Sequence, residues 1–259
     1  MKRTPLAKRP PPPPLGVSVV ITTFNRPKML ARLLDQVARQ TLPPREVIVV
    51  DDLSDDWKAV QRAIAPFHGR IRNLRILRKP EKLGLPSARN AGILAAKHPL
   101  IAFSDDDDEW RPDKLRRQVE VFRKAWAKVD LVYTWHLTKI HDKGVQKVMK
   151  PVHRGVAIRE ILWACFFQPS SVLAKREALI QAGLFDPRMR AMEDWEMWVR
   201  FFRRGFTCER CPIGNDASGQ FRASSAADMV EHLLEHRERG DKVPDDAIAE
   251  LRADEPGGT

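Results

Sequence analysis

Cysteine is scarce in this chain of 259 residues, which contains only three. So few thiols, odd in number, argue against a disulfide framework and suit a reducing compartment. Cys208 and Cys211 form a Cys-x-x-Cys pair, but no second pair of ligands lies at zinc-site spacing. The local sequence is typical of a strand that enters a turn. We therefore interpret both cysteines as structural.

The sequence also lacks a long apolar run. Its longest uninterrupted apolar segment covers residues 161–167, far short of the roughly 18 residues that a membrane-spanning helix needs. The basic residues near the N-terminus are followed by prolines instead of the apolar stretch of a signal peptide. We therefore expect a cytoplasmic protein, with peripheral association at the inner membrane face as a further option.

Acidic residues are fewer than basic ones, and the formal net charge is +11. The tail over residues 223–259 is acidic, so the excess of positive charge lies in the preceding part of the chain. A basic body attracts polyanions, such as nucleic acid, anionic membranes or phosphorylated small molecules. Charge alone does not choose among these partners.

Composition divides the chain into three parts. Residues 1–14 form a basic arm with an unbroken row of prolines, which we expect to be extended. Residues 15–215 have the pattern of one α/β domain, and residues 216–259 that of a helical extension with a polar tail. The sequence contains no internal repeat.

Strands alternate with helices along the predicted domain. Runs rich in apolar and β-branched residues predict buried strands, and apolar residues at helical spacing predict helices. The predicted strands cover residues 17–22, 46–51, 74–77, 100–103 and 170–173, and the helices begin at Pro27, Ser87, Pro112, Lys175 and Glu193. We expect Asn25 to cap the first helix. The alternation implies a largely parallel sheet with ligands at the carboxyl ends of its strands.

The most informative segment is the unbroken acidic run over residues 105–109, directly after the fourth predicted strand. In an extended run, Asp105 and Asp107 would point to the same side about 6.6 Å apart. Their repulsion at a partly buried edge favours a divalent cation, since hard cations choose oxygen ligands. A solvated acidic turn is the alternative. Thr22 and Asp52 also follow strand ends, so these polar residues are expected at one edge of the sheet.

Several motifs in fixed order resemble those of the family 2 glycosyltransferases, which have the GT-A fold. They lie within residues 17–27, 40–41, 46–52, 84–92, 101–108, 110–115 and 193–198. The resemblance covers about residues 15–205. It implies a single nucleotide-binding domain with a mostly parallel central sheet flanked by helices, a nucleotide-sugar donor, and Mn²⁺ or Mg²⁺ as cofactor.

The resemblance also implies roles for the acidic run. Asp107 matches the main metal carboxylate, and Asp105 and Asp106 match flanking positions that bind the nucleotide-sugar. The four consecutive aspartates leave this register open by one residue. A divalent ion at this place would neutralise the charge that grows on the departing diphosphate.

Four residues outside the run have implied roles too. Thr22 and Asp52 match positions that contact the nucleoside base, and Arg89 matches a basic position near the nucleotide. Asp194 matches the general base that takes the proton of the acceptor. The alternatives are a plain turn carboxylate for Asp52, an exposed helix arginine for Arg89, and a helix-capping role for Glu193 and Asp194.

The implied activity is an inverting transfer of one sugar from a UDP- or dTDP-linked donor to a glycan or lipid-linked acceptor, in cell-surface polysaccharide or glycolipid synthesis. No Gln-x-x-Arg-Trp motif follows Asp194, which argues against a processive synthase. A nucleotidyltransferase is an alternative, but the segment over residues 22–27 lacks the glycines of a phosphate loop. An inactive protein that binds nucleotide or nucleic acid is another. Because strand-end carboxylates repel phosphates, no nucleic-acid partner is expected.

Overall fold

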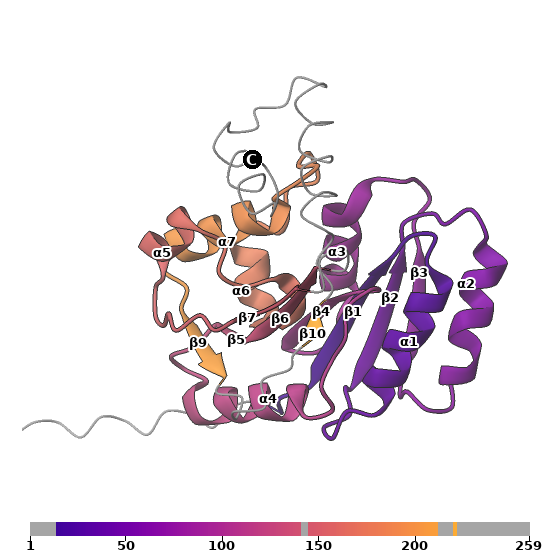
Figure 1. Ribbon diagram of the computed structural model, residues 1–259, viewed down its shortest axis with the longest axis horizontal. Coiled ribbons are helices and arrows are strands. Elements are labelled where there is room, and N and C mark those ends of the chain that lie inside the picture. The colour runs from indigo at the N-terminus through magenta and orange to yellow at the C-terminus, as the bar shows by residue number, and fades with distance from the viewer. Residues whose placement is uncertain (1–13, 141–144, 212–219, 222–259) are drawn as a thin grey trace, which may run out of the picture.

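The computed structural model describes residues 14–140, 145–211 and 220–221 (Figure 1). Its centre is a seven-stranded sheet in the order β3-β2-β1-β4-β8-β5-β9. These strands are β1 (Val17–Thr23), β2 (Glu46–Asp51), β3 (Leu74–Arg78), β4 (Leu100–Asp105), β5 (Leu131–Thr134), β8 (Val172–Lys175) and β9 (Cys208–Cys211). Only β8 runs antiparallel to its neighbours. The predicted α/β fold with a mostly parallel sheet is confirmed.

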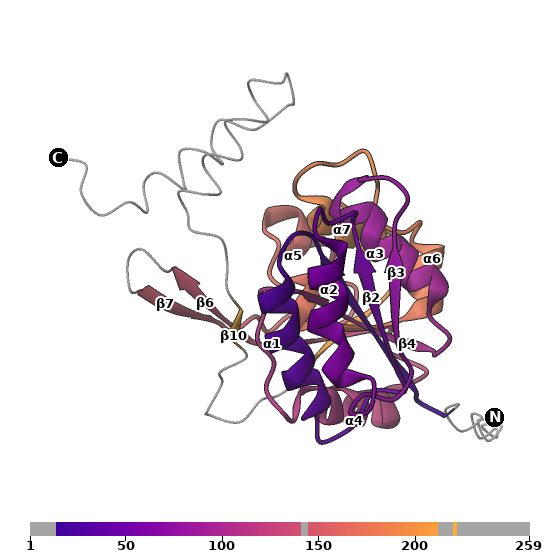
Figure 2. The same cartoon turned by 90° about the vertical axis from the view of Figure 1, so that its right-hand side faces the viewer.

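A second, three-stranded sheet consists of β6 (His136–Ile140), β7 (Val145–Met149) and β10 (Gln220–Phe221). It projects from the main body, as Figure 2 shows. No element was predicted for β6 or β7, and residues 220–221, which were predicted to belong to a helical extension, form a strand instead. Of the predicted strand over residues 170–173, the last two residues lie in β8, whereas the first two belong to a 3-10 turn, Pro169–Ser171.

Helices cover both faces of the main sheet (Figure 1). One face packs against α1 (Pro27–Ala38), α2 (Trp57–Ile64) and α4 (Lys114–Ala125). The other packs against α3 (Gly84–Ala95), α5 (Ile158–Trp163), α6 (Arg176–Gln181) and α7 (Glu193–Arg203). Five of these helices were predicted, whereas α2 and α5 were not. In the part of the chain that the structure describes, no helix combines the length and the apolar character needed to cross a membrane.

The start of α1 differs from the prediction. Its N-cap residue is Arg26, and no side chain caps it. Asn25 has a left-handed backbone, with φ of 55°, and its side chain instead exchanges hydrogen bonds with Asp55. The prediction that Asn25 caps α1 is therefore wrong, because the asparagine joins the β1–α1 loop to the loop after β2.

Close packing of α3 on the sheet depends on Gly92. A Cβ atom there would lie 2.2 Å from Cγ1 of Val20 in β1, a distance that real contacts do not reach. This approach places Arg89, one helical turn earlier, over the carboxyl end of the sheet.

The two cysteines of β9 lie in different cores. Cys208 belongs to the hydrophobic cluster on the α7 face, and Cys211 to the cluster on the α4 face. Both are free thiols. Since the two side chains lie on opposite faces of the sheet, the arrangement agrees with a structural interpretation.

Domain boundaries stay a prediction. Residues 1–13 of the predicted arm and nearly all of the predicted extension over residues 216–259 lie outside the described residues.

Candidate active site

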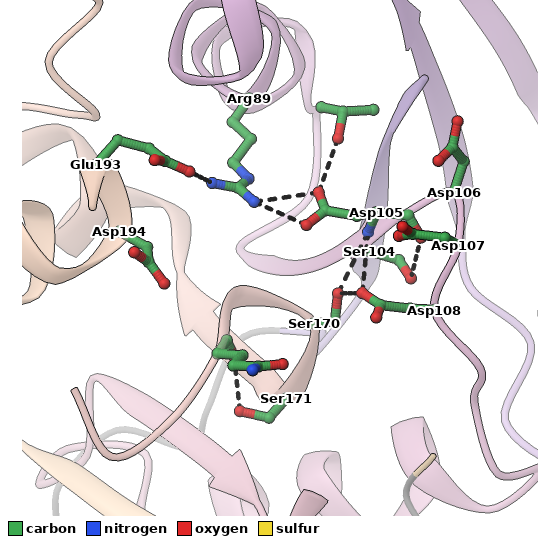
Figure 3. Close-up of polar contacts among 12 residues, drawn as sticks. Arg89, Ser104, Asp105, Asp106, Asp107, Asp108, Ser170, Ser171, Glu193 and Asp194 are labelled. Atoms are coloured by element: carbon green, nitrogen blue, oxygen red, sulfur yellow. Dashed lines mark hydrogen bonds and ion pairs between the residues drawn. The ribbon is translucent and has the colours of Figure 1, made fainter. Parts of the chain in front are cut away.

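The acidic run leaves the sheet as a turn. Strand β4 ends at Asp105, and the backbone N–H of Asp108 donates to the Asp105 carbonyl at 3.2 Å. The extended geometry considered for the run is therefore wrong, and its carboxylates point in different directions (Figure 3).

Asp105 is the carboxylate that faces α3 and α7. It accepts hydrogen bonds from Nη2 of Arg89 at 2.9 and 3.1 Å and from Oγ1 of Thr22 at 2.9 Å. The Thr22 contact follows from the sheet, since Thr22 and Asp105 are paired in the parallel register of β1 and β4. The Asp105 side chain is 30% exposed.

Arg89 joins two acidic segments that are far apart in the sequence. Its side chain is only 3% exposed, and its Nη1 donates to Oε1 of Glu193 at 2.6 Å. Burial opposes the charged guanidinium, but Asp105 and Glu193 outweigh this effect and raise its pKa. The buried Nε–H has no hydrogen-bond partner among the described residues. Arg89 is thus neither an exposed helix arginine nor free.

Asp194 stands in the first turn of α7, next to Glu193. Met192, which precedes them, has a left-handed backbone with φ of 55° and turns the chain into the helix. Burial raises the pKa of Asp194 to about 6, with a further contribution from Glu193 and an opposing one from Arg89. At pH 7 most Asp194 carboxylates are therefore ionised and still close to the pH at which they accept a proton.

Asp106 and Asp107 face the opposite direction, toward the β1–α1 loop. Asp106 is buried and accepts from Oγ1 of Thr23 at 2.6 Å, and burial raises its pKa to about 6. Asp107 is 25% exposed and accepts from Nη1 of Arg26 at 2.8 Å. The same Arg26 nitrogen lies 3.3 Å from Asp106, and the Arg26 side chain is 52% exposed. The long side chain of Arg26 thus places its positive charge next to Asp106 and Asp107.

Asp108 supports the turn from inside. It is buried and accepts a hydrogen bond from the Ser170 hydroxyl. The backbone N–H of Asp105 lies 3.3 Å from Oδ2 of Asp108 and 3.2 Å from Oγ of Ser170. Burial, followed by the charge of Asp105, raises the pKa of Asp108 well above its usual value.

Asp52 lies at the same sheet edge but is engaged with the loop that enters α3. Its carboxylate accepts from Nζ of Lys79 and the N–H of Gly84, both at 2.8 Å, and from the N–H of Leu83 at 3.2 Å. It is buried. These contacts support the alternative of a structural carboxylate, and the contact with a nucleoside base stays a prediction.

The carboxylates of the acidic run are the candidate ligands of a divalent metal. Within the described ranges, no group of three or more His, Cys, Asp or Glu side chains could hold one. Asp105 and Asp107 are partly exposed carboxylates of the run. Mg²⁺ is commonly bound by one or two carboxylates together with substrate phosphates. The residues therefore fit a site shared with a diphosphate, but not a cage built from protein alone.

Sequence reasoning missed three partners in the site. Arg26 follows the end of β1, directly beside β4 in the sheet, so its position in the Asn-Arg-Pro turn was a usable signal. Ser170 and the contact of Glu193 with Arg89 had no such signal, because they depend on where β8 and α7 fold back. The structure brings Thr22, Arg89 and Asp105 together. The carboxylate of Asp52 is hydrogen-bonded to Lys79, Leu83 and Gly84 instead.

Comparison with known proteins gives a consistent result. The family described as Glycosyl transferase family 2 matches residues 18–178. The amylovoran biosynthesis glycosyltransferase AmsB of Erwinia amylovora is 30% identical over 199 residues, which is 74% of this chain and 65% of AmsB. The putative teichuronic acid biosynthesis glycosyltransferase TuaG of Bacillus subtilis is 25% identical over 192 residues, 74% of this chain and 73% of TuaG. The chain spans 57% and 62% of two uncharacterised glycosyltransferases from Nostoc sp. and Haemophilus influenzae.

Two solved structures share the fold. S. aureus TarS 1-349 in complex with UDP superposes with a TM-score of 0.66 at 19% identity, over 92% of this chain and 70% of that one. The mannosyltransferase PcManGT from Pyrobaculum calidifontis, in complex with GDP-Man and Mn²⁺, gives a TM-score of 0.59 at 21% identity, over 92% of this chain and 68% of that one. At these identities the likeness concerns the fold.

Proposed function

Because the chain belongs to glycosyl transferase family 2, we propose that it transfers a single sugar from a nucleotide-sugar to an acceptor hydroxyl, with inversion. The observation that carries the proposal is the Arg89 bridge, by which we mean the contacts of Arg89 with Asp105 and Glu193. The bridge joins the acidic run behind β4 to the helix that carries Asp194.

On the donor side we assign the nucleotide-sugar to Thr22, Asp52, Arg89, Asp105 and Asp106, with a UDP- or dTDP-linked sugar as donor. A ribose or phosphate group that reaches Asp105 would replace contacts that Thr22 and Arg89 now make with it. Asp52 and Asp106 are buried, so they would act from beneath the nucleotide by holding the surrounding loops.

We assign the metal to Asp107, whose carboxylate is partly exposed. A Mn²⁺ or Mg²⁺ ion held there together with the donor diphosphate would neutralise the charge of the leaving group. Arg26 already contacts Asp106 and Asp107 and would compete with, or move aside for, an ion at this place.

Asp194 is the proposed general base. Inversion requires a base on the side of the sugar opposite the leaving diphosphate, and Figure 3 shows Asp194 and the acidic run on opposite sides of Arg89. A carboxylate with a pKa of about 6 is ionised at neutral pH and takes the hydroxyl proton as the new bond forms. Arg89 and Glu193 would hold the N-terminal turn of α7 in place for this step.

For the acceptor we propose a glycan or lipid-linked molecule in cell-surface polysaccharide or glycolipid synthesis. The names of AmsB and TuaG, which refer to amylovoran and teichuronic acid biosynthesis, support this choice. We propose a cytoplasmic enzyme, with peripheral association at the inner membrane face.

A thermal-shift panel tests the donor half of the proposal, since a ligand that binds only the folded state raises its stability. The panel contains UDP, dTDP, GDP and ADP and their sugar conjugates, each with and without Mn²⁺. We expect the largest rise in Tm for a uridine or thymidine diphosphate with Mn²⁺, and transfer or slow hydrolysis of the matching sugar conjugate. If no nucleotide changes Tm in either buffer, the proposal is wrong.

A further inference from the structure

A cavity lies at the opposite edge of the main sheet from the acidic run. We call it the amino-end basin, because its lining precedes the strands: Gly16 before β1, Arg45 before β2, Arg72 and Asn73 before β3, and His98 before β4, with Arg123 of α4. Its volume is about 530 Å³. Since β1 has 7 residues, the basin and the acidic run are roughly 20 Å apart along the strands.

Positive charge in the basin has no counter-ion among the described residues. The side chains of Arg45, Arg72 and Arg123 are exposed, none forms an ion pair within the described part of the chain, and no Asp or Glu lines the cavity. Three guanidinium groups around one hollow favour an anion between them.

Glu46, the carboxylate nearest to the basin in the sequence, does not neutralise these arginines. Glu46 follows Arg45 directly, but its side chain is 3% exposed and is paired with Arg75 at 2.9 Å. It also accepts from Oγ of Ser18 and from the N–H of Lys97, both at 2.6 Å. Glu46 is therefore fully engaged beneath the sheet edge, and the three arginines remain uncompensated.

Firm backbone contacts hold the rim of the basin. The N–H of Arg45 donates to the Val17 carbonyl at 2.9 Å, and Nδ2 of Asn73 donates to the Arg45 carbonyl at 3.0 Å. A Cβ atom on Gly16 would lie 2.6 Å from Nδ1 of His98, so a larger residue would displace the histidine from the lining. Arg45 and Arg72 thus lie just before strand ends, and Arg123 of α4 lines the same hollow.

The sequence before the basin carries the same sign of charge. Pro14 lines the cavity, and the residues before it include Lys2, Arg3, Lys8 and Arg9. Four basic residues and no acidic ones therefore precede Pro14 in the sequence. This adds to the attraction for a multiply charged anion.

We propose that the amino-end basin is a binding site for phosphate groups, separate from the proposed transferase site. Arginine is suited to this role because its planar fork binds phosphate oxygens through two parallel hydrogen bonds. The phosphate can belong to a free anion or to the headgroups of an anionic lipid surface. This site would give a role to basic residues that lie outside the proposed transferase site.

The test compares two triple variants of the full chain. Arg45→Gln, Arg72→Gln and Arg123→Gln remove the charges of the basin. Arg159→Gln, Arg203→Gln and Arg204→Gln remove three exposed arginines elsewhere that also lack ion pairs within the described residues, and they serve as the matched control. All six side chains are exposed, so both variants are expected to fold.

Binding of inorganic phosphate is measured by calorimetry, and binding of vesicles by co-sedimentation. We expect phosphate affinity to fall roughly tenfold or more in the basin variant and to stay within about twofold in the control. Loss of binding to phosphatidylglycerol vesicles, with no binding to phosphatidylcholine vesicles, would identify lipid headgroups as the source; loss of phosphate binding alone would identify a free anion.

The proposal is wrong if the basin variant binds phosphate as tightly as the control does, because the anion then lies elsewhere, for example at the acidic edge with a metal. It is also wrong if the wild type binds neither phosphate, up to about 10 mM, nor anionic vesicles. Sugar transfer should be unchanged in the basin variant, so this test and that of the proposed function fail independently.

Discussion

Replacing Asp194 by asparagine should abolish sugar transfer and at the same time stabilise the folded protein at neutral pH. The pKa of Asp194 is raised from 3.8 to about 6, chiefly by burial. Ionised Asp194 is therefore less favourable in the folded protein than in the unfolded chain. A difference of about 2 pKa units corresponds to about 3 kcal/mol, and partial exposure to solvent reduces this to about 1–3 kcal/mol.

The pH dependence gives the effect a clear sign. Between pH 3.8 and about 6 the folded protein holds a proton on Asp194 that the unfolded chain has released. The free energy of unfolding contributed by Asp194 therefore falls as pH rises through this window and stays low above it. Asparagine cannot ionise, so the advantage of Asp194→Asn over the wild type should be small near pH 4 and complete by pH 7.

Urea unfolding at several pH values measures the stability difference, and calorimetry with UDP and Mn²⁺ measures nucleotide affinity. Glu196→Gln is the matched control, because Glu196 lies on the same helix and pairs with Arg200 away from the acidic run. We expect the control to keep its turnover and to lose up to about 1 kcal/mol. If Asp194→Asn is less stable than the wild type at pH 7 and also loses nucleotide affinity, Asp194 is a structural carboxylate and the assignment of the base is refuted.

Three further predictions concern metal binding, a buried lysine and helix packing. In Asp107→Ala, Mn²⁺ should no longer enhance UDP binding; unchanged metal dependence would move the ligand to a neighbouring aspartate. Burial lowers the pKa of Lys114 from 10.5 to about 7. Lys114→Met removes this buried charge but also the hydrogen bond from Nζ to Oε1 of Gln118 at 2.9 Å. We therefore expect it to be about 1–3 kcal/mol more stable than the wild type at pH 7, an advantage that shrinks toward pH 10.5 in urea titrations. Gly92→Ala should lower the stability by about 1–3 kcal/mol, because its Cβ would meet Val20 at 2.2 Å, whereas Gly69→Ala, with open space around it, should be nearly neutral in the same thermal melts.

The parallel half of the fold could be predicted closely from the sequence. Strands β1, β2 and β4 begin at the predicted residues, since strands buried on both faces appear as continuous apolar runs. The segment from β5 to β7 was not predicted, because its pairing depends on β8, which inserts antiparallel between β4 and β5. Neither α2 nor α5 was predicted; α2 has 8 residues and α5 has 6, so each offers few positions for a helical pattern to be recognised.

The sequence predicted which residues belong to the candidate site, but only some of the contacts among them. Neighbouring parallel strands end at the same edge, so the meeting of Thr22 with Asp105 follows from the strand pattern. The contact between Arg89 and Glu193 does not, since it spans 104 residues of sequence. Nothing local indicates that the helix after Met192 folds back against the end of β4.

The crowded carboxylates of the acidic run were predicted to need a cation, and this prediction holds only in part. Crowded carboxylates at a partly buried edge do require cations, and the structure supplies three of them as arginines. Arg89 lies between Asp105 and Glu193, and Arg26 lies between Asp106 and Asp107. Arg32 pairs with Glu109 at 3.2 Å. Repulsion in the run is therefore no longer evidence for a metal by itself. The case for a metal rests instead on the partial exposure of Asp107 and on the diphosphate that the family's donors carry, which is why the Mn²⁺ dependence of UDP binding is the measurement that decides it.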